Sequence, residues 1–97
     1  MIRARFSSVA LRDVAEAQAW YSERGTRLDL DLRDELDQVI ERMRQHPAGF
    51  PLIRRNIRRA NLRRFPYGVF YIEKVDHLLV IGVVHHARHP DLWKRRG

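Results

Sequence analysis

The side chains best suited to acid–base chemistry gather near the carboxyl end of the chain, at His85, His86 and His89, with Arg88 among them. Histidine titrates near neutral pH, so one of these residues could act as base or acid while Arg88 stabilises a phosphate. With Arg64 as a further cation, the set would suit a metal-independent endoribonuclease. The other interpretation is a polar strand end followed by a solvated turn, which we favour because no matched partner for a histidine is recognisable.

Metal and cofactor chemistry is not predicted. Adjacent residues of a strand point to opposite faces of the sheet, which argues against one ion bound by both His85 and His86. The chain has no cysteine, which excludes thiolate ligands and disulfides and is compatible with a reducing cytoplasm. No stretch is long and apolar enough to span a bilayer, so we expect an intracellular protein. The residue types above predict neither a cofactor nor a metal.

A second group of candidate residues is a run of arginines that contains no acid. The net charge of +7 comes almost entirely from arginine. The arginines of the run are Arg42, Arg44, Arg54, Arg55, Arg58, Arg59, Arg63 and Arg64. A planar guanidinium binds phosphates and carboxylates alike, so the predicted partner is a nucleic acid or an acidic protein segment. Solvated edge charge and an arginine-rich genome are the alternatives.

Two β-rich runs must position these side chains. Val69 to Glu73 and Leu78 to Val84 are dominated by Val, Ile, Phe and Tyr, which is typical of strands. The second run, LLVIGVV, is almost continuously apolar, so it is predicted to be central in the sheet or covered on both faces. Tyr67 and Tyr71 are four residues apart and share a face, and we expect core packing for at least one of them.

The first predicted helix extends from Val9 to Arg24, with Ser7 or Ser8 as its N-cap. One face of this helix is apolar and consists of Ala10, Val14, Ala17 and Tyr21. Trp20 projects among the charges instead. Two interpretations of Trp20 are open: it packs under a neighbouring loop, which we favour, or it faces a partner.

A second helix is predicted to begin after Thr26, as its cap, and to end before Pro47. Its apolar stripe consists of Leu28, Leu32, Leu36, Val39, Ile40 and Met43. Acids occupy its first turns and basic residues its last, as the helix dipole favours. This placement explains the acid cluster of the sequence without a metal or catalytic site.

The remaining segments complete a single domain over residues 1–97. Met1 to Phe6 and roughly Ile57 to Phe65 are predicted strands, Phe50 to Leu52 a connector, and Trp93 could hold a short terminal turn against the body. The order is therefore strand, two helices and three strands (β-α-α-β-β-β). It predicts an α+β fold, with an antiparallel helix hairpin on one face of a small, mostly antiparallel sheet.

This order, with its FPYGVFY strand and closing VVHHARHPDLW segment, resembles the RelE/ParE family of bacterial type II toxins over essentially the whole chain. The residues that carry the resemblance are Ala10, Asp13, Pro47, Arg59, Phe65, Pro66, Tyr67, Tyr71, His85, Arg88, Pro90 and Trp93. The resemblance implies a cytoplasmic toxin that inhibits growth, of a kind linked to plasmid stabilization, silenced in a hetero-oligomer by a cognate antitoxin. Family antitoxins often carry an acidic, disordered segment, which fits the basic charge of this chain.

The two branches of that family imply different targets. RelE-like members cleave messenger RNA on the ribosome, whereas ParE-like members bind DNA gyrase. Gly68 stands where RelE-like members commonly carry a catalytic arginine, and Trp93 where they carry a tyrosine, so we favour the ParE-like branch. The ribosome-dependent nuclease, using His85, His86, Arg88 and Arg64, is the alternative. The residues predicted to bind antitoxin or target are Trp20, Arg58, Arg59, Arg63, Arg64, Arg88 and Trp93.

Overall fold

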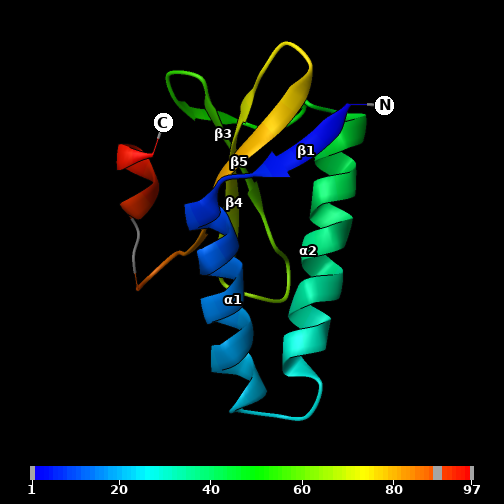
Figure 1. Cartoon of the computed structure of the whole chain (residues 1–97), viewed down its shortest axis with the longest axis vertical. Coiled ribbons are helices and arrows are strands. Elements are labelled where there is room, and N and C mark those ends of the chain that lie inside the picture. Colours follow the sequence, from blue (N-terminus) through cyan, green and yellow to red (C-terminus); the bar gives the residue numbers. More distant parts are fainter. Residues whose placement is uncertain (1, 89–90, 97) are drawn as a thin grey trace.

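The fold is a five-stranded sheet with a helix hairpin on one face and a short 3₁₀ helix on the other (Figure 1). A computed structural model describes residues 2–88 and 91–96 of the chain. Its elements are β1 (Arg3–Phe6), α1 (Ser8–Ser22), α2 (Leu28–Gln45), β2 (Leu52–Arg54), β3 (Ile57–Asn61), β4 (Tyr67–Glu73), β5 (His77–His85) and η1 (Leu92–Arg95). This arrangement confirms the predicted α+β class.

The sheet has the strand order β1-β5-β4-β3-β2. The β1–β5 pair is parallel and the other pairs are antiparallel. β5 is covered on both faces: Leu78, Val80 and Val83 lie in the core under the helices, whereas Ile81 and Val84 lie in a second cluster on the side of η1. The continuous apolar run of the sequence therefore does encode a strand that is central and doubly covered.

The two helices bury the stripes that their periodicity predicts. The Ser7 hydroxyl accepts a hydrogen bond from the Ala10 amide at 3.1 Å, which satisfies one donor of the first turn of α1. The fully covered residues of the hairpin are Ala10, Val14, Ala17, Leu32, Leu36, Val39 and Met43. Asp29 and Asp31 occupy the first turn of α2, and Arg42 and Arg44 the last, as the dipole argument predicts.

The predicted cap of α2 is wrong. The residue that precedes the helix is Arg27, not Thr26, and no side chain caps its amides. Arg27 adopts a left-handed conformation with φ of 67°, because the chain must reverse direction between the antiparallel helices within a few residues. The Arg27 carbonyl then accepts the amide of Asp31 at 2.9 Å and begins the helical hydrogen-bond ladder.

Two boundaries on the far edge of the sheet also differ from the prediction. Leu52 is not part of a connector but begins β2, a three-residue edge strand. β3 ends at Asn61, four residues before the predicted end at Phe65. The Glu35 carboxylate of α2 accepts hydrogen bonds from the backbone amides of Arg63 and Arg64, each at 2.9 Å. These two amides therefore cannot extend the backbone hydrogen-bond ladder of β3.

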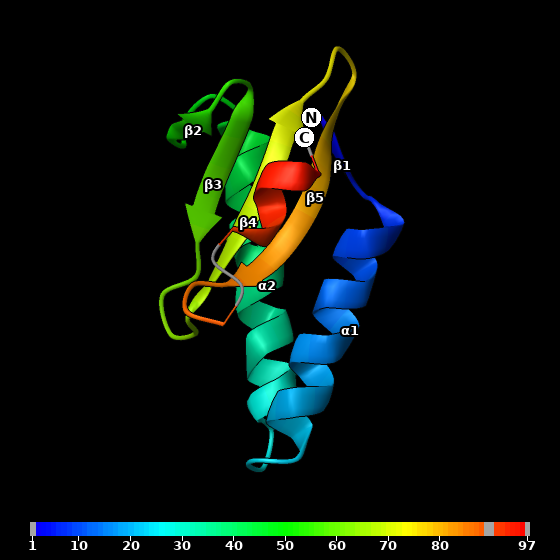
Figure 2. The same ribbon diagram turned by 90° about the vertical axis from the view of Figure 1, so that its left-hand side faces the viewer.

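The C-terminal segment covers the face of the sheet that the helices leave open (Figure 2). Trp93 of η1 stacks on Phe70 of β4, with ring centroids 5.0 Å apart and planes inclined by 10°. Trp93 therefore holds the terminal turn to the body, as its position predicts. Among the described residues, no helix has both the length and the apolar character needed to cross a membrane.

Candidate partner-binding site

A cleft of about 520 Å³ lies between α1 and the segment that follows β5. Its walls include Glu16 and Trp20 from α1, His85 and Arg88 from the end of β5 and the next turn, and Leu92 from η1. Trp20 and Leu92 keep relative exposures of 36% and 40%. The cleft thus combines exposed apolar surface with charged groups of both signs.

Trp20 and Arg88, both predicted to bind a partner, meet in this cleft. The Arg88 guanidinium donates to the Tyr67 hydroxyl at 2.7 Å and lies 4.6 Å from the centroid of the Trp20 ring. Arg24 lies 3.6 Å from the same centroid. Burial raises the pKa of Tyr67, and the nearby Arg88 opposes that rise only in part. The favoured interpretation of Trp20 as a loop-covered residue is wrong, since it lines the cleft beside these cations.

The histidines of the predicted nuclease site lie apart. The His85 ring meets Tyr67 edge-on at 5.1 Å, and its Nδ1 accepts the amides of Ala87 and Arg88 at 3.1 and 3.0 Å. His86 instead lies beside Gly68, on the other face of the sheet, where burial and then the charge of Arg59 lower its pKa. His85 therefore organises a turn, and the two rings do not share one site.

His89, the third histidine of the candidate acid–base cluster, lies outside the described residues. So does Pro90, one of the residues that carry the family resemblance. Arg64, the remaining cation of the nuclease prediction, is bound to Asp31 of α2 at 3.7 Å. Within the described part of the chain, no group of three or more His, Asp or Glu side chains is placed to hold a metal ion.

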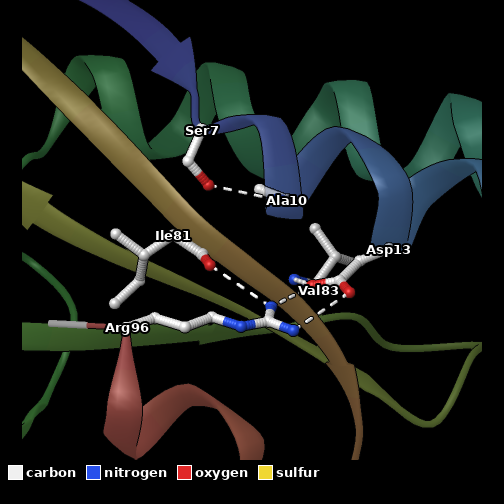
Figure 3. Close-up of polar contacts among 6 residues, drawn as sticks. All are labelled: Ser7, Ala10, Asp13, Ile81, Val83 and Arg96. Atoms are coloured by element: carbon white, nitrogen blue, oxygen red, sulfur yellow. Dashed lines mark hydrogen bonds and ion pairs between the residues drawn. The ribbon is translucent and has the colours of Figure 1, made fainter.

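In the wall of the cleft, an ion pair closes the edge of β5 where β1 has ended (Figure 3). β1 pairs with β5 only as far as Val80. Beyond this point the Val83 amide donates to the Asp13 carboxylate at 3.0 Å, and Arg96 donates to the Ile81 carbonyl at 3.3 Å. Asp13 and Arg96 also pair with each other. Two side chains thus replace a neighbouring strand, and nothing in the local sequence around Arg96 signals this role.

The arginines of the acid-free run differ in their surroundings. Arg58 faces the helix side, where it pairs with Glu73 at 2.9 Å and donates to the Phe50 carbonyl at 2.6 Å. Arg59, the next residue, points to the other face and has no acid within ion-pair distance among the described residues. Arg63 is exposed, in the loop after β3. The structure therefore does not bring the predicted binding residues to one place.

Trp93, another predicted binding residue, has a relative exposure of only 9%. Its ring packs on Phe70, and Lys94 approaches it to 5.8 Å. Its placement is that of a core residue of the second apolar cluster. A direct role of Trp93 in binding stays a prediction.

Comparison with known proteins identifies a family and similar solved structures. The model of the "ParE toxin of type II toxin-antitoxin system, parDE" matches residues 4–90. A chain from a solved chromosomal ParDE TA system of P. aeruginosa has a TM-score of 0.76 to this chain at 17% identity, and the alignment covers 88% of this chain and 96% of that one. At such identity the likeness shows the fold alone. None of the curated proteins matches.

Proposed function

The chain belongs to the ParE toxins of type II toxin–antitoxin systems, and from this membership we propose that it poisons DNA gyrase by protein binding. A cognate antitoxin silences it in a cytoplasmic hetero-oligomer. The observation that carries the proposal is the family match over residues 4–90. The cleft between α1 and the C-terminal segment supports a mechanism that depends on binding.

The residues exposed in this cleft are of the types that dominate protein interfaces. Tryptophan, tyrosine and arginine supply most hot spots. The two aromatic side chains bury a large area with little loss of side-chain freedom, and arginine adds directional hydrogen bonds and ion pairs. Trp20 and Arg88 are already held against each other, and Tyr67 fixes the guanidinium. A partner therefore meets a preorganised surface, which lowers the entropy cost of binding.

An acidic antitoxin segment fits the same cleft chemically. Its aliphatic residues would cover Trp20 and Leu92, and a carboxylate would pair with the outer edge of Arg88. Among the described residues Arg88 has no acid within ion-pair distance, so such a carboxylate would not displace an existing partner. The ordering cost of the segment would be offset by the apolar surface that it buries.

The RelE-like alternative has less support from the placement of its residues. Acid–base cleavage requires its groups within hydrogen-bond reach of one substrate. His85 and His86 lie on opposite faces of the sheet, and Arg64 is bound to Asp31. These separations favour the gyrase proposal over messenger RNA cleavage.

Supercoiling by purified gyrase tests the proposal. We expect the purified chain to inhibit supercoiling, and we expect Trp20→Ala with Arg88→Gln to weaken inhibition at least tenfold if target and antitoxin share the cleft. Arg3→Gln with Leu30→Ala, which alters exposed residues elsewhere, is the matched control. Normal supercoiling at an excess of folded protein would exclude gyrase. Pulse-labelling after induction then separates the alternatives, since a nuclease stops protein synthesis before DNA synthesis.

A further inference from the structure

The acid-free run of arginines is divided between the two faces of the sheet. On the helix side, Arg58 pairs with Glu73 at 2.9 Å, and the largely exposed Arg64 lies 3.7 Å from Asp31. Arg54, Arg55 and Arg59 have no such partner: among the described residues no acid lies within 4.0 Å of their guanidinium groups. These three arginines, at the β2–β3 turn and on β3, therefore keep their positive charge available to a partner.

Three of the cations in this region border a second cleft, of about 350 Å³, between the β2–β3 turn and η1. Its lining consists of Arg54, Arg55, Asn56, Ile57 and Lys94. Arg55 adopts a left-handed conformation with φ of 52°, which sets the shape of the tight turn. Lys94 is partly compensated by Asp91 at 3.0 Å.

Arg59 extends this surface along β3. It follows Ile57 by two residues, so the two side chains share a face of the sheet. Arg54 and Arg55 lie at the β2–β3 turn, and Arg59 is the third residue of β3, about 7 Å beyond Ile57 along the strand. Duplex DNA carries roughly one charge per 1.7 Å of its axis, so cations spread over this distance can meet more than one phosphate.

We propose that Arg54, Arg55, Arg59 and Lys94 form a binding surface for the phosphate backbone of duplex DNA. This function is separate from the gyrase and antitoxin proposals, because the surface lies on the other side of the sheet from the helix hairpin and uses none of Trp20, Arg88 or Leu92. Bound in this way, the toxin would add sequence-independent contacts to any DNA complex that contains it.

The composition of the surface favours duplex DNA over a peptide. A disordered acidic peptide must bury apolar area to offset the cost of its ordering. Four of the five lining residues are polar or charged, and the fifth, Ile57, has a relative exposure of 3%. Binding to a preformed duplex requires no such apolar burial, because its main driving force is the release of counterions.

The same surface is poorly suited to single-stranded nucleic acid. Single-strand sites combine cations with exposed aromatic side chains on which bases stack. Among the described residues, no aromatic side chain lines this cleft, and the rings of Phe70 and Trp93 on this side of the sheet are stacked on each other. Cations without stacking platforms match a duplex, whose bases are already stacked.

Fluorescence anisotropy of a labelled duplex, titrated with the full chain over a range of salt, tests this proposal. The test variant is Arg54→Gln, Arg55→Gln and Arg59→Gln together. The plot of log K against log salt has a negative slope, and loss of three phosphate contacts should make it shallower by roughly 2–3. Replacement of the same residues by lysine should retain most of the slope, which shows that charge rather than folding is responsible.

The control variant is Arg3→Gln, Arg5→Gln and Arg27→Gln, which removes the same charge from exposed positions and also includes one left-handed arginine. We expect it to keep the slope of the unmodified chain. If the salt slope became shallower by the same amount in both variants, net charge alone would explain the binding, which would overturn the proposal. So would tighter binding of single-stranded RNA than of the duplex, or equal competition by polyglutamate at matched charge.

Discussion

Asp13 connects three parts of the molecule through one carboxylate. It is anchored in α1, accepts the Val83 amide of β5 and pairs with Arg96 after η1. The side chains of Asp13 and Arg96 are only 10% and 14% exposed. Removal of one partner from a buried pair leaves a charge without compensation, which is among the more costly changes that a single substitution makes.

We predict that Asp13→Ala lowers the free energy of unfolding by about 3 kcal/mol. Asp13→Asn should cost less, since its amide oxygen can still accept the Val83 proton. Urea denaturation measures both, and a double-mutant cycle with Arg96→Ala should show a coupling above about 1 kcal/mol. Glu16→Ala, an exposed position of the same helix, serves as control. A cost for Asp13→Ala equal to that of the control would exclude a structural role.

Tyr71 is the largest fully buried side chain, and its hydroxyl donates to the Pro47 carbonyl at 2.7 Å. Burial raises its pKa to about 12, and Arg58 opposes this rise only in part. In the unfolded chain the phenol titrates near 10. Between these values the unfolded state loses a proton that the folded state keeps, so the free energy of unfolding falls as pH rises above about 10.

Tyr71→Phe should therefore change the alkaline limb of the stability curve. At pH 8 the variant is expected to be weaker by about 1 kcal/mol, because the Pro47 carbonyl loses its donor. Between about pH 10 and 12 the unmodified chain should lose up to about 1.4 kcal/mol per pH unit through this group, and the variant should lack this component. Denaturation at stepped pH measures the difference. Identical alkaline slopes would contradict the assignment.

At the scale of elements, the loop after β3 depends on α2. Glu35 accepts the amides of Arg63 and Arg64, each at 2.9 Å, and thereby fixes the point at which β3 ends. The acid cluster of the sequence is thus more than a complement to the helix dipole: one of its members holds a loop of the sheet. This loop carries two of the arginines predicted to bind a partner.

We predict that Glu35→Ala frees the loop without unfolding the hairpin. Loss of two charge-assisted acceptor contacts should lower the free energy of unfolding by about 2 kcal/mol. The amides of Arg63 and Arg64 should exchange with solvent at least tenfold faster, as measured by hydrogen exchange. Asp34→Ala, on the exposed neighbouring position, is the control. Unchanged exchange at both amides would show that β3 ends for another reason.

At the scale of the whole molecule, the distribution of charge decides how partners approach. The net charge of +7 attracts any acidic segment over a Debye length of about 10 Å. The cleft at Trp20 lies beside α1 at the β5 end of the sheet, whereas the surface at Arg54, Arg55 and Arg59 lies at the β2–β3 end. An acidic antitoxin can therefore be steered by the overall field and still bind by apolar contact at the first cleft.

Association with the antitoxin should slow as salt rises, whereas dissociation should change little. We expect the association rate constant to fall roughly tenfold between low and physiological ionic strength. Stopped-flow tryptophan fluorescence measures both rates, since Trp20 lines the cleft. The variant with Gln at positions 54, 55 and 59 should bind more slowly but dissociate at the same rate. A salt-independent association rate would remove electrostatic steering from the mechanism.

The fold class and the buried stripes follow from local patterns of the amino-acid sequence. The apolar period of α2, the continuous run of β5 and the shared face of Tyr67 and Tyr71 are local patterns, and burial follows from them because side-chain direction repeats with the backbone. The resemblance to RelE/ParE toxins, which the family match bears out, rested on the same ordered elements. The terminal anchor at Trp93 could also be predicted, since a large apolar residue in a polar tail needs a surface to cover.

Which charges are compensated and which groups meet depends on the packing of distant segments. Asp13 and Arg96 are 83 residues apart, and Glu35 is 28 residues from Arg63, so no local pattern connects them. Likewise Arg58 and Arg59 are neighbours of the same type, yet one is bound to Glu73 and the other is not. An ion pair depends on the distance between two groups in space, and that distance is settled only when the strands and helices have packed.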